Sequence, residues 1–99
     1  MDEKWVIDKE SAEEVKSDVT DQYALKKWKK YESDVTDSPF FHPKPKRIKK
    51  LAGSKFPPGA YRYRNDPLRV VYYPQKGDRT IFTLGAGSAS NISYKKRSS

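Results

Sequence analysis

The sequence predicts an α+β fold with two helices on one face of a small, mainly antiparallel sheet. Three observations predict it: an apolar run of strand-forming residues near the N-terminus, a helical 3.6-residue period over residues 24–35, and three closely spaced strand candidates after Pro57. The expected order is β-α-α-β-β-β, with a possible extra strand at the C-terminal end. A chain of 99 residues fits one domain, residues 1–99.

The first two elements are a short strand and a helix. Trp5-Val6-Ile7 is apolar and rich in strand formers. The quartet Ser11-Ala12-Glu13-Glu14 is typical of a capping box, in which the serine hydroxyl and the glutamate satisfy free amides at a helix N-terminus. We therefore expect a helix that begins at Ser11 and turns Ala12 and Val15 inward.

A second helix is expected after Thr20 or Asp21, either of which can cap it. Its apolar positions fall at the spacing of one helical face and are Ala24, Trp28, Tyr31 and Val35. The lysines at 26, 27, 29 and 30 lie mostly off that face. They indicate a solvated helix surface more strongly than a phosphate contact.

The segment from Ser38 to Lys46 is predicted to be an irregular connection, because its three prolines end the helical pattern. Phe40 and Phe41 are its candidate anchors. His42, the single histidine of the chain, is interpreted as a packing or surface residue rather than as an acid or base.

Strand signals dominate the remainder. Ile48 and Leu51 are expected to cover the core edge, and Pro57-Pro58-Gly59 is a strong turn signal. Three strands should follow as an antiparallel meander, at 60–64, 68–73 and 80–84. Residues 85–90 are expected to be a flexible turn, and residues 91–97 a last short strand or a turn.

Composition excludes several classes of protein. With no cysteine, disulfide frameworks, thiolate metal sites and cysteine nucleophiles are excluded. The acidic N-terminus lacks the pattern of a signal peptide, and no apolar run approaches the roughly 18 residues of a membrane span. We expect a cytoplasmic protein without membrane contact.

Charge is distributed unevenly. Residues 1–37 hold 7 basic and 11 acidic side chains, whereas residues 38–99 hold 14 basic and 2 acidic ones. So much positive charge on part of a small surface favours a polyanionic partner such as RNA or DNA. A basic, solvated surface without a ligand is the alternative.

The alternation in the strand 60–64 separates aromatic from basic side chains. If Tyr61 and Tyr63 pack on the helices, Arg62 and Arg64 project from the other face, about 6–7 Å apart, a spacing that suits consecutive phosphates. Arg69 adds a third cation on the next strand, although a polar solvent face needs no ligand. Either face of that strand offers a tyrosine, and Tyr73 shares the face of Arg69, where it can stack a base.

Other chemistries are weakly supported. The glycines near residue 85 lack the following helix and lysine of a phosphate loop. The basic half contains no zinc or di-carboxylate constellation, since its two acids, Asp66 and Asp78, are both in predicted turns. No serine triad is signalled.

Four segments carry a resemblance to a known family: LAGSKFPPGAYRYR, LRVVYY, TIFTLGAG and ISYKKR. Together with the order of elements, they resemble the RelE/ParE superfamily of toxins from toxin-antitoxin systems, over most of the chain. The resemblance implies one toxin domain, residues 1–99, of the RelE-like branch. Such a protein is a ribosome-dependent endoribonuclease, an mRNA interferase that cuts messenger RNA without a metal or other cofactor and so inhibits translation.

By position, the resemblance implies four catalytic residues, which are Arg62, Arg64, Arg69 and Tyr94. We further expect RNA contacts from Lys49, Lys50, Tyr73, Lys95, Lys96 and Arg97. Guanidinium groups held in place would stabilise the negative charge that builds on the phosphate during attack by a 2′-hydroxyl. Arginine stays protonated, so the general base is the least defined part of this mechanism.

One departure from the family pattern affects the functional expectation. Nuclease members commonly carry a basic residue after the glycine of the fourth strand, and this chain has Ala86, Gly87, Ser88 and Ala89 there. Two alternatives therefore stay open: a ParE-like toxin that inhibits DNA gyrase without nuclease activity, and a non-catalytic RNA-binding module. The expected partners are a cognate antitoxin protein, the ribosome and messenger RNA.

Overall fold

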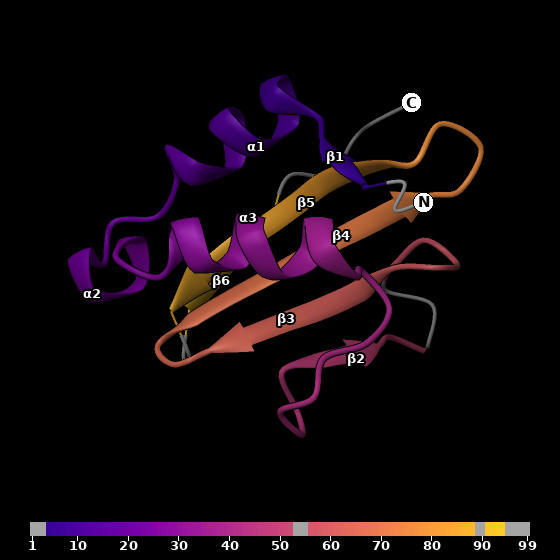
Figure 1. Ribbon diagram of the computed structural model, residues 1–99. Helices are drawn as coiled ribbons and strands as arrows, with labels where there is room; N and C mark the ends of the chain where they lie inside the picture. The colour runs from indigo at the N-terminus through magenta and orange to yellow at the C-terminus, as the bar shows by residue number, and fades with distance from the viewer. Residues whose placement is uncertain (1–3, 53–55, 89–90, 95–99) are drawn as a thin grey trace.

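The computed structural model describes residues 4–52, 56–88 and 91–94. Within them the helices are α1 (Lys9–Lys16), α2 (Gln22–Leu25) and α3 (Trp28–Asp37). The strands are β1 (Val6–Ile7), β2 (Ile48–Lys50), β3 (Tyr61–Asn65), β4 (Leu68–Gln75), β5 (Thr80–Ser88) and β6 (Asn91–Tyr94) (Figure 1). This arrangement confirms the expected α+β class. It has one helix more than the sequence pattern predicted, the possible C-terminal strand forms as β6, and β2 is an additional strand.

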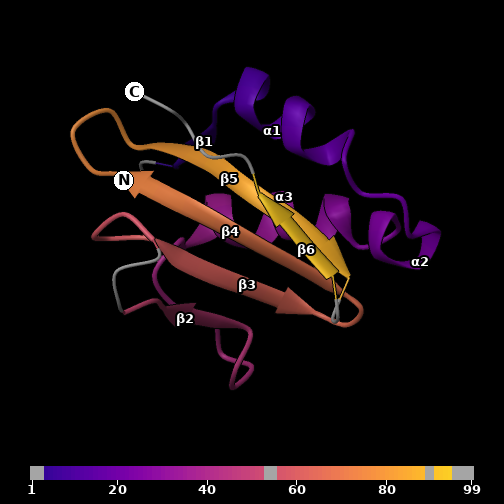
Figure 2. The same cartoon turned by 180° about the vertical axis from the view of Figure 1, so that it is seen from behind.

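The sheet has the order β1-β5-β4-β3-β2, and β6 also pairs with β5. The meander of β3, β4 and β5 is antiparallel as predicted, whereas β1 runs parallel to β5 and places Val6 opposite Thr80. Figure 1 shows α1 and α3 covering one face of the sheet. The other face, seen in Figure 2, is covered by none of the described helices and is called the open face below.

Helix α1 begins earlier than the capping-box pattern predicts. Asp8 is the N-cap, and its carboxylate accepts a hydrogen bond from the Ser11 amide at 2.9 Å. Ser11 is instead buried inside the helix, where its hydroxyl accepts a hydrogen bond from the Thr83 amide of β5 at 3.1 Å. The serine therefore links α1 to the sheet, a role that only the packed structure assigns to it.

The predicted second helix is divided into α2 and α3. Asp21 caps α2 as expected, accepting hydrogen bonds from the amides of Tyr23 and Ala24. The Lys27 amide then donates to the Ala24 carbonyl at 2.9 Å, a tighter 3₁₀-type turn that separates the two helices. The predicted apolar face nevertheless holds across the break, because Ala24, Trp28, Tyr31 and Val35 are all buried.

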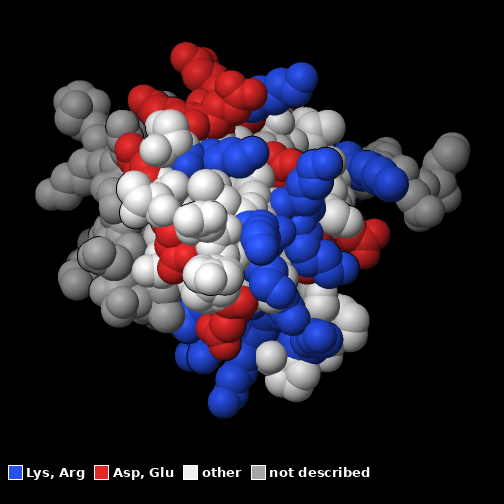
Figure 3. Space-filling view, turned by 90° about the vertical axis from the view of Figure 1, so that its left-hand side faces the viewer, with Lys and Arg blue, Asp and Glu red and all other residues white. Residues whose placement is uncertain are grey.

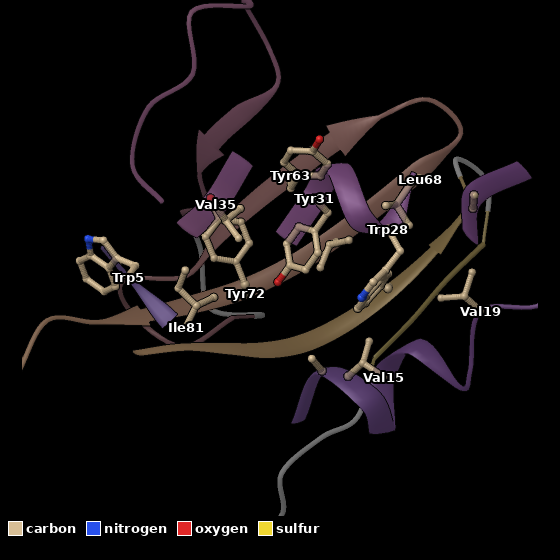
Figure 4. Packing of buried hydrophobic residues seen from close by; sticks show 14 residues of the cluster. Trp5, Val15, Val19, Trp28, Tyr31, Val35, Tyr63, Leu68, Tyr72 and Ile81 are labelled. Carbon is tan, nitrogen blue, oxygen red and sulfur yellow. The ribbon is translucent and has the colours of Figure 1, made fainter. Parts of the chain in front are cut away.

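Aromatic rings fill the space between the helices and the sheet (Figure 4). Tyr31 of α3 lies 5.3 Å from the Tyr63 ring and 6.0 Å from the Tyr72 ring, measured between centroids. Each hydroxyl has a partner: Tyr31 and Thr83 at 2.9 Å, Tyr63 and Asp34 at 2.7 Å, and Tyr72 and the Pro39 carbonyl at 2.6 Å. Burial raises the pKa of all three phenols, to about 12 for Tyr63.

The connection between α3 and β2 is fixed to the helix by His42. Its Nε2 lies 3.4 Å from the Asp34 carboxylate, while its Nδ1 accepts a hydrogen bond from the Lys44 amide at 3.0 Å. Both ring nitrogens are therefore engaged. This histidine packs the connection on the helix side of the sheet, in agreement with its interpretation from the sequence.

The two phenylalanines of that connection differ. Phe40 packs edge-on against Trp5 and Tyr61, both at 5.4 Å between ring centroids. Phe41 is 67% exposed, so its prediction as an anchor is wrong. Phe40 is held because Trp5 and Tyr61 both present a ring to it, which the local sequence does not indicate.

The glycine-rich segment after residue 84 also differs from the prediction of a flexible turn. Strand β5 continues through Gly85, Ala86 and Gly87 to Ser88, and these residues pair with β4 on one side and β6 on the other. The register of the β4–β5 ladder shifts between Val71 and Tyr72, a bulge that locally reshapes the sheet beside these small residues. Residues 89 and 90 lie outside the described residues.

Candidate nucleic-acid interface

Strand alternation separates the two kinds of side chain on β3. Tyr63 is fully buried and Tyr61 packs against the core, so both face the helices. Arg62 and Arg64 consequently belong to the open face. On β4, Leu68, Val70 and Tyr72 are in the core, which assigns the face of Arg69 and Tyr73 to the open side. Alternation in the sequence alone leaves this choice undecided.

Arg62, Arg64 and Arg69 form one arginine cluster. Arg64 lies directly opposite Arg69 in the β3–β4 ladder, and Arg62 is two residues earlier on the same strand. Like charges directly opposite each other destabilise a sheet pair. The strands thus hold three guanidinium groups together in an arrangement that the fold itself does not favour.

Asp66 partly neutralises this cluster from the turn between β3 and β4. Its Oδ1 lies 2.6 Å from Arg69 Nη1 and 3.5 Å from Arg64 Nε. The hydrogen bond from Arg69 lowers the pKa of the Asp66 carboxyl below its usual value, and the charges of both arginines add to this effect. One carboxylate therefore orients two arginines and leaves the cluster with excess positive charge.

Arg62 has no such carboxylate partner among the described residues. Burial lowers the pKa of its guanidinium, and the charges of Arg64 and Arg69 lower it further. Its Nε is buried without a hydrogen-bond partner within the described part of the chain. An unsatisfied, partly desolvated donor beside two like charges is a site where an anion would be stabilised.

Aromatic and apolar side chains occupy the other end of the open face. A pocket of about 500 Å³ is lined by Pro57, Pro58, Tyr73, Phe82 and Leu84. Gly59, with φ of +90°, lets the preceding turn approach Tyr73, since a Cβ there would lie 3.1 Å from the tyrosine ring. The open face therefore combines cations with an apolar surface, as the sequence predicted for stacking a base beside its phosphates.

The two lysines of β2 that we expected to contact RNA lie on opposite faces of the sheet. Lys49 lies opposite Arg62 and extends the basic row to the sheet edge. Lys50 lies opposite Tyr61, whose side chain faces the helices, and it lines a different pocket with Phe40 and Tyr61. Strand alternation therefore places Lys50 on the opposite face from Lys49 and the arginine cluster, and its expected RNA contact stays a prediction.

Tyr94 lies in β6, so the strand rather than the turn forms at residues 91–94. The cross-strand row that begins at Arg62 passes through Val71 and Gly85 and ends at Tyr94. Three strand spacings of about 4.8 Å put the Tyr94 backbone roughly 14–15 Å from that of Arg62, at the same level of the sheet. Lys95, Lys96 and Arg97 lie outside the described residues.

Two contacts near the arginine cluster are not evident in the sequence pattern: one at Asp66 on the open face, and one at Arg47, whose guanidinium reaches the Tyr63 ring on the helix side. Asp66 is predicted only as a turn residue, although a two-residue hairpin loop places the flanking Arg64 and Arg69 opposite each other and its own carboxylate between them. Arg47 is predicted only to lead into the next segment, but it stacks over the Tyr63 ring with 5.9 Å between the guanidinium carbon and the ring centroid. The hairpin spacing is a usable signal for Asp66, whereas nothing local indicates Arg47.

The described residues were also compared with the requirements of membrane spans and metal sites. No helix among them is long and apolar enough to cross a membrane. Residues 4–52, 56–88 and 91–94 also contain no group of three or more His, Asp or Glu side chains arranged to hold a metal ion. Comparison with protein-family models, curated proteins and solved structures gave no match for this chain. Its functional assignment therefore depends on the geometry of the open face.

Proposed function

We propose that this protein is a RelE-like toxin, a ribosome-dependent endoribonuclease that cuts messenger RNA without a metal. The observation that carries the proposal is the arginine cluster: three guanidinium groups on two paired strands, with one carboxylate between them and a buried Arg62 Nε that has no partner among the described residues. The order of elements and the sequence motifs are similar to those of the RelE/ParE superfamily, which supports the same assignment.

The cluster suits cleavage by the neighbouring 2′-hydroxyl. In this reaction the 2′-oxygen forms a bond to phosphorus, the bond from phosphorus to the 5′-oxygen breaks, and the products are a 2′,3′-cyclic phosphate and a 5′-hydroxyl. Negative charge on the phosphoryl oxygens rises in the transition state, and groups already held in place stabilise it without reorganising. Asp66 supplies that preorganisation for Arg64 and Arg69.

We assign Arg62 the direct contact with the reacting phosphate, because its guanidinium is the least neutralised of the three. Arg64 and Arg69 contact the same phosphate or the next one along the strand, and Tyr73 stacks a base. The resemblance gives Tyr94 the role of orienting the nucleotide or moving the proton of its 2′-hydroxyl. A cognate antitoxin of acidic character would neutralise this basic surface.

The decisive experiment adds the purified protein to ribosomes programmed with a defined messenger RNA and maps new 3′ ends by primer extension. Naked RNA is treated in parallel. We expect cuts on ribosomes alone, and their loss in Arg62→Ala/Arg64→Ala. The matched control, Lys9→Gln/Lys16→Gln, removes the same charge from exposed positions of α1 and should cut normally. Cleavage that survives the arginine substitutions would show that the site assignment is wrong.

One observation favours a second candidate, a ParE-like toxin that inhibits DNA gyrase. Gly87 lies opposite Arg69 and Ala86 opposite Val70, so the strand positions where nuclease relatives commonly carry a cation add no charge to the cluster. Under this alternative, gyrase supercoiling is inhibited and messenger RNA stays intact. RNA binding in the absence of both activities would instead identify a non-catalytic RNA-binding module.

A further inference from the structure

A second basic pocket lies at the sheet edge beside the arginine cluster. It has a volume of about 310 Å³ and is formed where the connection from α3 to β2 meets the end of β3. The side chains that line it include Lys44, Lys46, Arg47, Arg64, Asn65 and Asp66. Figure 3 shows many basic side chains along this end of the molecule, down to its lower part, together with a group of acidic ones at the top and a few others among the basic ones.

Arg47 is held rigidly in this pocket. Its carbonyl accepts a hydrogen bond from the Arg64 amide at 2.7 Å, and its own amide donates to the Lys44 carbonyl at 3.2 Å. Its guanidinium stacks over the Tyr63 ring. Lys46 adopts a positive φ of 70°, an uncommon conformation for a residue other than glycine. The backbone of the connection is therefore tied to β3 in one defined conformation.

The pocket has more positive charge than its own acid can neutralise. Asp66 is already engaged by Arg69 at 2.6 Å and by Arg64 at 3.5 Å. Within the described residues, no ion pair reaches Lys44, Lys46 or Arg47. The Arg47 guanidinium interacts with the Tyr63 hydroxyl, but its Nη1 is buried and has no hydrogen-bond partner there. A buried guanidinium donor without an acceptor is costly, and an anionic oxygen would relieve that cost.

A phosphate group fits these requirements. It offers several charged oxygens, guanidinium groups bind it through two parallel hydrogen bonds, and flanking ammonium groups add charge without demanding a fixed geometry. Arg64 lines this pocket and also belongs to the arginine cluster. A strand bound at the cluster can therefore reach the pocket through its next phosphates.

We propose that the pocket of Lys44, Lys46 and Arg47 binds a backbone phosphate of the RNA strand, outside the position that is cut. The inference rests on the proposed function and extends it, since it assigns a direction to the RNA: from the arginine cluster across Arg64 and past the end of β3. The pocket contributes to affinity and to the register of the strand, and the bond that breaks lies at the cluster.

The test uses the full chain and labelled single-stranded RNA of two lengths, about four and about twelve nucleotides. Fluorescence anisotropy gives the affinity at increasing salt concentrations. Lys44→Gln/Lys46→Gln changes two exposed side chains, so the variant is expected to fold. On the longer RNA its plot of log K against log salt should be shallower by about 0.7 for each phosphate that the pocket no longer neutralises. On the shorter RNA, which occupies the cluster alone, the slope should match that of the unmodified protein.

Lys9→Gln/Lys16→Gln is the control for net charge and should leave both slopes unchanged. The pocket's role in RNA binding is rejected if the slope on the longer RNA changes equally in the two lysine variants. It is also rejected if the slope does not change in Lys44→Gln/Lys46→Gln. If Arg62→Ala/Arg64→Ala still weakens binding in that case, the proposed function stands and the pocket alone is rejected. If the unmodified protein binds neither RNA in a salt-dependent way, the pocket is rejected, and the proposed function is decided separately by the cleavage assay on ribosomes.

Discussion

The two faces of the sheet are formed by alternating residues of the same strands, but they differ in how their polar and charged groups are paired. On the helix side, Tyr63 and Tyr72 are buried and their hydroxyls are paired with Asp34 and the Pro39 carbonyl. On the open side, Arg62 is two positions from Arg64, and Arg64 lies opposite Arg69. One face satisfies its polar atoms, and the other concentrates positive charge with too few acceptors.

The contrast shows which face is built for stability. Buried polar groups in a core must find partners, or the fold loses several kcal/mol. Charges on the open face do not contribute in this way, because repulsion between them opposes folding. We infer that the helix side maintains the fold and that the open side adds little to stability, and four substitutions test that division.

The largest expected effect on stability is on the helix side. Trp28 is 2% exposed and packs 5.0 Å from the Tyr31 ring, between centroids. Trp28→Ala removes this packing and leaves a cavity, so we expect a loss of about 3–5 kcal/mol in the free energy of unfolding. Urea denaturation followed by circular dichroism measures it. The exposed neighbour provides the control, and Lys29→Ala should stay within about 0.5 kcal/mol of the unmodified protein.

A smaller loss is expected when one hydrogen bond of the core is removed. Tyr63→Phe keeps the ring and deletes the donor to Asp34, whose carboxylate then loses its shortest hydrogen bond. The expected cost is about 1–3 kcal/mol in the same unfolding experiment. Tyr23→Phe is the matched control, since Tyr23 is 69% exposed. Equal stabilities for the two variants would contradict the structural role assigned to the helix side.

On the open face, Asp66→Asn should give a modest and pH-dependent loss. The folded pKa of Asp66 lies below the ordinary value of 3.8, chiefly because Arg69 donates a hydrogen bond to it. A depressed folded pKa means that the stabilisation is present above pH 3.8 and is lost as the pH falls through the lower, folded pKa. The midpoint of thermal unfolding should therefore be lower for the variant than for the unmodified protein at pH 7. This difference in midpoint should become smaller in acid.

Asp78→Asn, at the other acidic turn of the basic half, is the control for Asp66→Asn and should show no such pH-dependent difference. If the difference in midpoint between Asp66→Asn and the unmodified protein stayed the same in acid, Asp66 would act through something other than its charge. If Asp66 preorganises the arginines, its substitution should also slow messenger RNA cleavage on ribosomes, without the complete loss expected for the arginine double variant.

The smallest expected change in stability is for Arg62→Gln. Removing this cation relieves repulsion from Arg64 and Arg69, so the unfolding midpoint should stay the same or rise. Any gain should shrink as salt is added, because exposed charges are screened. A loss of more than about 1 kcal/mol would assign Arg62 a structural role and break the division between the two faces. The same variant should lose cleavage, which distinguishes a ligand-binding residue from an idle one.

Much of the fold could be predicted because local periodicity shows which residues share a face. The spacing of Ala24, Trp28, Tyr31 and Val35 predicted a buried helical face, and all four are buried even though the chain breaks between α2 and α3. The break itself depends on a backbone turn at Lys27 that residue types do not signal. The same limit applies to β2, a three-residue edge strand too short for a recognisable pattern.

Only part of the arginine cluster could be predicted from the sequence, namely that Arg62 and Arg64 share a face. Alternation along β3 separated Arg62 and Arg64 from the tyrosines, but the partner of Arg69 depended on the register between β3 and β4. The separation of Lys49 from Lys50 was not predicted because no strand was expected at residues 48–50, and only the pairing with β3 places Lys49 opposite Arg62 and Lys50 opposite Tyr61. Arg47 could not be predicted because its contact with Tyr63 joins positions that are distant in the sequence.

By itself, the sequence determined the class of fold, the buried face of residues 24–35 and the concentration of positive charge in the second half of the chain. These follow from composition and from the helical period. The tertiary structure decided which face of β4 is open, where Asp66 reaches and how Arg47 completes a second basic pocket. The physical reason is that alternation creates two faces but does not say which one is covered. That choice is made when α1 and α3 bury the tyrosine side, because its apolar area stabilises the fold and the arginine side must stay hydrated.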